Sequence, residues 1–212
     1  MTLIEPEAYT RFMKNPVIGV TGIMSSGKST LCKALSQIGF EAISSDDLVA
    51  GLYNKGSAGA KALSKLKVKG IVKKDGSVDK PKLRALMFSD AKFRKKVEAI
   101  VHPIIVSEIK KLLIKKKDKL VAVEIPLLFE AKLESLCSYT VTVFRKKEEA
   151  LCSIKNKYKI NIAEAQNMLD AQLDLVEKMI KSDFTIFNNG TINDLNKKAT
   201  TLKRSIMTLW KK

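Results

Sequence analysis

Residues 22–29 carry the pattern in this chain that is best suited to chemistry. They read Gly-Ile-Met-Ser-Ser-Gly-Lys-Ser, which fits the spacing G-x-x-x-x-G-K-[ST]. Glycines let the backbone curl until successive N–H groups point at phosphate oxygens, and a helix that starts here adds the positive end of its dipole. The pattern predicts a cradle for nucleotide phosphates; the alternative is a structural glycine turn.

Each polar group of this loop has an expected task. Lys28 supplies a point charge to the terminal phosphates of ATP, and the Ser29 hydroxyl is a ligand for Mg²⁺. The loop residues expected to contact the phosphates are Gly22, Ser25, Ser26, Gly27, Lys28, Ser29 and Thr30.

Carboxylates at two further places could reach the same phosphates. Asp46 and Asp47 lie just past a strand-like run at 40–44, and Glu124 closes another at 119–125. The carboxyl ends of parallel strands surround the ligand crevice, where a carboxylate can deprotonate an acceptor hydroxyl or hold Mg²⁺ through water. The alternatives are a helix cap at Asp46 or Asp47 and a salt bridge at Glu124.

A parallel α/β sheet would position these residues. The order of strand, loop, helix and strand over residues 17–44 is the βαβ opening of such a sheet, with Gly39 ending the first helix. Asn188-Asn189-Gly190 is typical of a turn. Strands are expected at 17–21, 40–44, 119–125, 139–144 and 184–187. Helices are expected at 28–38, 81–88, 91–101, 103–117 and 192–210, and within 146–181 with a break near 158–161.

The composition favours one domain of a cytoplasmic protein. The 212 residues are 45% hydrophobic, and no apolar run reaches the length of a membrane span. Residues 1–15 form a polar leader without a secretory core. The scattered residues Cys32, Cys137 and Cys152 form no metal-type pair and are expected to be reduced thiols.

The net charge of +17 suits polyanionic partners such as ATP and a phosphorylated substrate. Nucleic acid is the less favoured partner, because only five of the 39 basic residues are arginine and the lysines spread along the whole chain. We interpret most of the lysines as solvated surface residues.

Several further strings, in the same order and spacing, resemble the dephospho-coenzyme A kinase family. The resemblance covers about residues 17–192. It begins with Ile18–Thr30 and Ala42–Leu48, and continues with Phe88-Ser89-Asp90, His102–Ile105, Glu124–Glu130, Gln172, Ser182-Asp183 and Asn188-Asn189-Gly190. A phosphate loop alone would not select this family, whereas its combination with His102-Pro103 and Pro126–Glu130 is specific.

The resemblance implies a P-loop kinase that transfers phosphate from ATP to the ribose 3′-hydroxyl of dephospho-coenzyme A, an alcohol acceptor. It implies a parallel sheet flanked by helices, with a helical substrate-binding insertion and a helical lid. The corresponding ranges are 17–50, 119–145 and 182–212 for the nucleotide-binding core, 51–118 for the substrate region and 146–181 for the lid.

The resemblance also assigns roles to single residues. Asp46 matches the general base, Glu124 and His102 are implied to contact the substrate, and Lys157 and Asn189 are implied to contact ATP. Mg²⁺ is expected to be held by Ser29, with Asp46 or Glu124 acting through water. For His102, packing between the substrate region and the core is favoured over contact with the substrate, and for Asn189 the alternative is an ordinary turn.

Five positions depart from the family pattern. Ser44 replaces an aspartate, Glu124 replaces an aspartate, and Met24-Ser25 stands where the family often has Ile-Gly. Lys157 stands where the lid usually carries an arginine, which keeps the charge but loses the bidentate fork. The rival hypotheses are another nucleoside or nucleotide kinase, a basic P-loop protein that binds nucleic acid without kinase turnover, and a degenerate paralogue.

Overall fold

The computed structural model describes residues 13–210. Residues 1–12, most of the predicted polar leader, and residues 211–212 lie outside the described residues, as does the side chain of Phe88. The chain divides into two compact units. The first contains the chain up to Ser44 and from Leu113 onward, and the second contains Ser45–Leu112.

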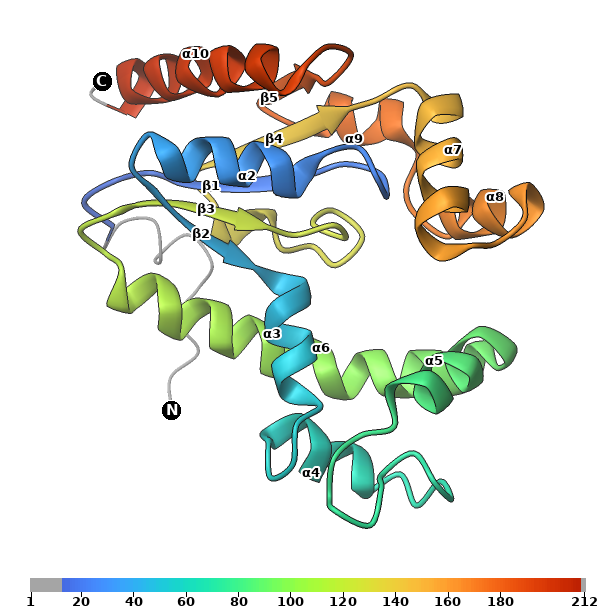
Figure 1. Ribbon diagram of the computed structural model, residues 1–212. Helices are drawn as coiled ribbons and strands as arrows, with labels where there is room; N and C mark the ends of the chain where they lie inside the picture. The colour runs from blue at the N-terminus through green and yellow to red at the C-terminus, as the bar shows by residue number, and fades with distance from the viewer. Residues whose placement is uncertain (1–12, 211–212) are drawn as a thin grey trace. The chain divides into compact units, whose positions relative to one another are not determined.

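A parallel five-stranded sheet forms the centre of the first unit (Figure 1). Its strands are β1 (Val17–Thr21), β2 (Phe40–Ser44), β3 (Leu120–Glu124), β4 (Tyr139–Phe144) and β5 (Phe184–Phe187). They lie in the order β2-β3-β1-β4-β5, so β1, which leads into the glycine-rich loop, is central. The predicted α/β class is confirmed.

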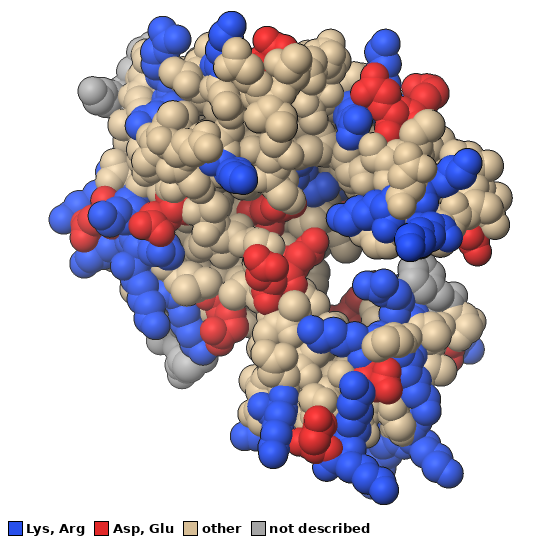
Figure 2. Space-filling view, viewed as in Figure 1, with Lys and Arg blue, Asp and Glu red and all other residues tan. Residues whose placement is uncertain are grey.

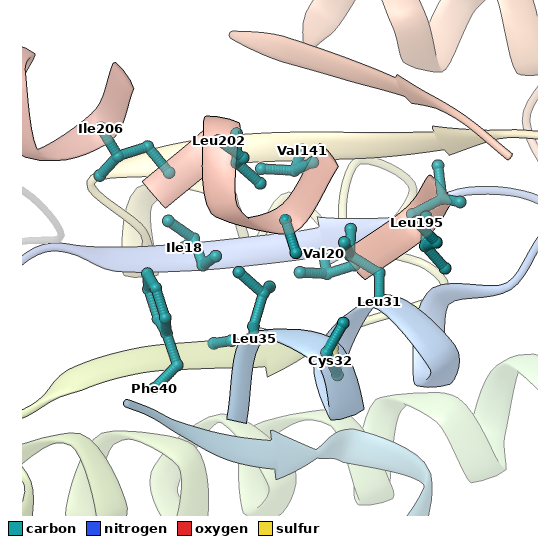
Figure 3. Packing of buried hydrophobic residues seen from close by; sticks show 14 residues of the cluster. Ile18, Val20, Leu31, Cys32, Leu35, Phe40, Val141, Leu195, Leu202 and Ile206 are labelled. Atoms are coloured by element: carbon teal, nitrogen blue, oxygen red, sulfur yellow. The ribbon is translucent and has the colours of Figure 1, made fainter. Parts of the chain in front are cut away.

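Two helices cover one face of this sheet and bury the main hydrophobic core. They are α2 (Lys28–Gln37) and α10 (Ile192–Trp210). Figure 3 shows the side chains of β1, β4, α2 and α10 converging; each fully buried aliphatic side chain contributes about 1.5–3 kcal/mol. This core includes Ile18, Val20, Leu31, Leu35, Phe40, Val141, Leu195, Leu202 and Ile206.

A second, smaller core joins the glycine-rich loop to the helices after β4. These helices are α7 (Lys147–Tyr158), α8 (Ile162–Asp170) and α9 (Leu175–Lys181), with a short 3₁₀ turn, η1 (Glu134–Leu136), before β4. The predicted break near 158–161 is confirmed, because Lys159 adopts a φ of 55° and Asn161 caps α8. Ile23 from the loop packs in one cluster with Ala150, Ile154, Ala165 and Leu169.

The second unit is helical. It contains α3 (Ser45–Leu52), α4 (Ala58–Ser64), α5 (Lys80–Ser89) and most of α6 (Ala91–Lys115), with one antiparallel bridge between Val72 and Val78.

The prediction of two helices at 91–101 and 103–117 was wrong, because α6 runs through Pro103. Apolar side chains recur at four-residue intervals along α6, and all of them are buried: Val97, Val101, Ile105, Ile109 and Leu113. Their burial offsets the backbone hydrogen bond that a proline removes.

Basic side chains are widespread on the surface. Figure 2 shows lysine and arginine side chains over the viewed face of both units, with acidic side chains in smaller groups. Among the helices of residues 13–210, none is long and apolar enough to cross a membrane.

Candidate active site

The loop between β1 and α2 has the backbone that a phosphate cradle requires. Gly22 and Gly27 adopt φ values of 140° and 101°, which side chains disfavour. A Cβ atom at Gly22 would lie 2.5 Å from the carbonyl oxygen of Val143, and one at Gly27 would lie 2.2 Å from Nδ2 of Asn188. Gly22 therefore needs glycine for space as well as conformation, whereas at Gly27 the obstacle is the end of one side chain and the positive φ is the stronger constraint.

Lys28 spans the loop from the first turn of α2. Its side chain is buried, and its ammonium donates hydrogen bonds to the carbonyl oxygens of Gly22 (3.2 Å) and Ile23 (2.9 Å). The charge is therefore held beside the curled backbone, where a terminal phosphate would rest.

Ser29 and Glu124 meet although 95 residues separate them in the sequence. The Ser29 hydroxyl donates to Oε1 of Glu124 at 2.8 Å. Glu124 is the last residue of β3, and its register partners are Val20 on β1 and Ser44 on β2. A hydroxyl and a carboxylate are oxygen ligands of the kind that Mg²⁺ prefers, so this pair fits the ion. Within residues 13–210 no cluster of three or more His, Cys, Asp or Glu side chains forms a separate metal site.

Three side chains outside the loop bind its backbone. Arg145 donates from Nη1 to the carbonyl oxygen of Ser25 at 3.1 Å. Asn188 donates from Nδ2 to the Ser26 carbonyl oxygen at 2.8 Å. The Met24 N–H donates to Oε1 of Gln172 at 2.9 Å.

The sequence did not assign these three contacts. Arg145 follows β4 directly, and Asn188 follows β5 directly, so both stand at the carboxyl end of a parallel strand. Ligand-facing side chains concentrate at that end of the sheet. This position was the available signal for Arg145, which the phosphate-loop pattern does not include.

A cavity of about 260 Å³ opens beside the start of α2. Its lining is mostly polar and includes Thr30, Arg145, Asn188, Asn189, Gly190 and Ile192. It brings Asn189, predicted from the sequence, into the same pocket as the loop residue Thr30.

Ser26 differs from the other predicted phosphate contacts. Its side chain is completely buried, and its Oγ has no hydrogen-bond partner within residues 13–210. Its N–H donates to the carbonyl oxygen of Ile23 at 3.1 Å. A phosphate contact from the Ser26 hydroxyl would therefore require the loop to move.

The remaining predicted residues lie on helices. Asp46 and Asp47 are exposed in the first turn of α3, where carboxylates are favoured by the helix dipole. His102 is half-buried in α6. Lys157 is exposed in the last turn of α7, with its Nζ 5.4 Å from the centroid of the Tyr158 ring. Asp46 and His102 belong to the second unit, and Lys157 to the first.

An ion pair with a buried lysine holds the segment after β3. Lys178 on α9 is fully buried, and its Nζ contacts Oε1 of Glu130 at 2.8 Å and the carbonyl oxygen of Pro126 at 2.7 Å. The Thr21 hydroxyl donates to the same Pro126 oxygen at 3.1 Å. Burial lowers the pKa of Lys178, and the hydrogen bond and charge of Glu130 oppose that shift.

Comparison with known proteins identifies the family. A sequence model described as dephospho-CoA kinase matches residues 16–194. The chain belongs to this family. A dephospho-CoA kinase from Fusobacterium nucleatum is 34% identical over 182 residues, which cover 86% of this chain and 94% of the relative. One from Bacillus licheniformis is 31% identical, and the matched residues cover 84% of this chain and 90% of the relative.

Solved structures share the fold, and one of them is a dephospho-CoA kinase. Dephospho-CoA kinase from Campylobacter jejuni has a TM-score of 0.65 at 29% identity, covering 90% of this chain and 96% of its own. The crystal structure of TT1252 from Thermus thermophilus has a TM-score of 0.76 at 29% identity, covering 91% and 98%. A shikimate kinase from Aquifex aeolicus, 18% identical with a TM-score of 0.51 over 87% of this chain and 94% of its own, shares the fold.

Proposed function

We propose that this member of the dephospho-CoA kinase family transfers the γ-phosphoryl group of ATP to the ribose 3′-hydroxyl of dephospho-coenzyme A. The products are coenzyme A and ADP, and this reaction is the last step of coenzyme A synthesis. The observation that supports the proposal best is the glycine-rich loop with Lys28 and the Ser29–Glu124 pair at its mouth, in a chain of this family.

The loop residues act by charge and position. Backbone N–H groups between Gly22 and Thr30 bind phosphate oxygens at the start of α2. The Lys28 ammonium exchanges its contacts with the loop carbonyls for the β- and γ-phosphates, and neutralises charge that builds during transfer. When bound, Mg²⁺ supplies further charge neutralisation on these phosphates; Ser29 would hold it directly and Glu124 through water.

Asp46 accepts the proton of the acceptor hydroxyl. It lies two residues beyond Ser44, whose partner across the sheet is Glu124, and it occupies the exposed first turn of α3. An exposed carboxylate there can orient the hydroxyl and receive its proton. Because Ser44 is not an aspartate, Asp46 is the first carboxylate that follows β2.

The remaining roles are substrate binding and exclusion of water. The helical region 51–118, with His102, binds dephospho-coenzyme A. The 146–181 segment closes over ATP, with Lys157 reaching the phosphates and Asn189 contacting the base. Closure would suppress ATP hydrolysis, because water no longer competes with the acceptor hydroxyl.

A coupled assay of ADP release with dephospho-coenzyme A tests the proposal. We expect Lys28→Ala to abolish turnover, and Asp46→Asn to lower kcat about 10²–10⁴-fold, the usual range for a general base, while ATP still binds. Asp47→Asn is the matched control in the same helical turn and should retain most activity. Normal turnover of Asp46→Asn would exclude Asp46 as the base.

A substrate panel separates the proposal from its rivals. Phosphorylation of nucleoside monophosphates, without turnover of dephospho-coenzyme A, would indicate a different nucleotide kinase. Salt-sensitive RNA or DNA binding without any kinase turnover would indicate a nucleic-acid-binding P-loop protein. ATP binding with no turnover of any acceptor would indicate a degenerate paralogue.

A further inference from the structure

We propose that Arg145 is a positioning residue for the phosphate loop, which fixes the left-handed conformation of Ser25 by binding its carbonyl oxygen. This inference rests on the proposed ATP-dependent activity, because the loop is taken to bind ATP. The observation behind it is a hydrogen bond from the charged side chain of Arg145 to Ser25, which is the one non-glycine residue of residues 22–27 with a positive φ.

Ser25 adopts a backbone conformation that its side chain disfavours. Its φ is 60°, in the left-handed region that glycine enters freely and other residues enter at a cost. Such a conformation persists where surrounding contacts determine it. The Arg145 guanidinium provides such a contact, because its Nη1 donates to the Ser25 oxygen at 3.1 Å. A hydrogen bond from a charged donor is stronger than one between neutral groups.

Arg145 is itself held in place on its other edge. Its Nε donates to Oε2 of Glu149 at 3.2 Å, one turn along on α7. The planar guanidinium thus bridges a carboxylate on α7 and a carbonyl of the loop. Lysine has no such fork and could not hold both groups in a fixed geometry.

The residues on both sides of Ser25 are fixed by different elements. Gln172 accepts from the Met24 N–H, and Asn188 donates to the Ser26 carbonyl oxygen. Met24 also packs against the small core formed by Ile23, α7 and α8. Arg145 therefore completes a set of contacts in which each residue from Met24 to Ser26 is bound by a side chain from outside the loop.

The consequence concerns the direction of the loop N–H groups. If the Ser25 carbonyl loses its donor, the peptide plane between Ser25 and Ser26 gains freedom, and the cradle must be ordered again when ATP binds. ATP affinity should therefore fall. The KM for dephospho-coenzyme A and the stability of the sheet should not change.

Replacement of Arg145 in two backgrounds tests this mechanism. ATP affinity is measured by titration calorimetry, without turnover, for Arg145→Gln, Ser25→Gly and the double variant. We expect Arg145→Gln to weaken ATP binding about tenfold in the wild-type background, the effect of one charge-assisted hydrogen bond. In the Ser25→Gly background, where the conformation is unstrained, the same replacement should weaken ATP binding by about threefold or less. The KM for dephospho-coenzyme A should stay unchanged.

The controls separate positioning from direct contact and from misfolding. Arg204→Gln, at an exposed position on α10, should leave ATP affinity unchanged. If Arg145→Gln does not fold, Glu149→Gln replaces it and should show a smaller loss that Ser25→Gly again reduces. An equal loss in both backgrounds would overturn the proposal, because Arg145 would then contact ATP itself. No loss in the wild-type background would also overturn it. A wild-type chain that neither binds ATP nor turns over would instead refute the proposed function.

Discussion

The three cysteines differ in burial: Cys32 is buried, Cys137 is partly buried and Cys152 is exposed. Desolvation raises the pKa of the Cys137 thiol to about 12. A thiol with a raised pKa stays protonated at pH 8 and reacts slowly, because the thiolate is the nucleophile. We expect the native chain to react rapidly with one equivalent of a disulfide reagent at pH 8, and the unfolded chain with three. Loss of the rapid phase in Cys152→Ser would confirm the site, and its persistence would contradict the prediction.

The ion pair between the buried Lys178 and Glu130 should contribute to stability. Lys178→Met removes the donor to the Pro126 carbonyl and leaves the Glu130 carboxylate without its cation. We expect the free energy of unfolding to fall by about 2 kcal/mol, less than for a fully buried pair because the Glu130 side chain remains 21% exposed. Urea denaturation measures this change.

Lys181→Met on the same helix is the matched control. Lys181 pairs with Glu177 at the surface, and such pairs contribute about 0–1 kcal/mol. Equal destabilisation by both variants would show that burial does not distinguish the two pairs.

At this scale the sequence predicted local chemistry better than long-range contacts. The spacing of Gly22, Gly27, Lys28 and Ser29 was enough to predict the phosphate cradle, because one short segment forms both the curled backbone and the start of the helix. The hydrogen bond between Arg145 and Ser25 joins residues 120 positions apart, and neither residue type predicts the other. Such contacts depend on how the strands are ordered in the sheet.

The same contrast holds among the secondary-structure elements. All five strands were predicted to within one residue, because short β-branched runs between polar turns resemble little else. The single helix α6 was predicted as two, because Pro103 is a strong local signal for a break. The long buried apolar stripe of α6 outweighs it. Tertiary burial therefore decided the course of α6, in which local and global preferences disagree.

The start of α10 should make stability depend on pH. Thr191 and Asp194 form a reciprocal cap: the Asp194 carboxylate accepts from the N–H and the hydroxyl of Thr191, and the Thr191 hydroxyl accepts from the Asp194 N–H. The backbone and side-chain hydrogen bonds from Thr191 lower the pKa of Asp194 below its ordinary 3.8. The stabilisation is therefore present above pH 3.8 and is lost as the pH falls through the lowered pKa.

Asp194→Asn tests this cap. We expect a lower Tm than wild type at pH 7, because the carboxylate is a stronger acceptor than the amide. The difference should narrow as the pH falls below 3.8, when the wild-type carboxyl is protonated. In a Thr191→Ala background the substitution should have less effect at pH 7. A Tm difference that does not change with pH would contradict a role for the carboxylate charge.

At the scale of the whole molecule, positive charge is the dominant electrostatic feature. The chain has a net charge of +17, and the second unit, Ser45–Leu112, contains 16 lysines and arginines against 7 aspartates and glutamates. Ion pairs such as Lys14–Asp118 and Lys116–Glu41 engage single lysines of the first unit, but the net excess of positive charge already counts their carboxylates and remains. Self-repulsion should therefore destabilise the folded chain at low ionic strength.

Adding salt should relieve this repulsion. We expect Tm to rise as KCl increases from about 10 mM to about 150 mM, over which the screening length falls from about 30 Å to about 8 Å. Lys28→Ala should show nearly the same rise, because screening acts on the summed charge and not on the phosphate loop. A rise confined to the chain with Lys28 would indicate anion binding by the loop instead. A fall in Tm with salt would mean that the favourable ion pairs outweigh the excess of lysines, which would contradict the net-charge argument.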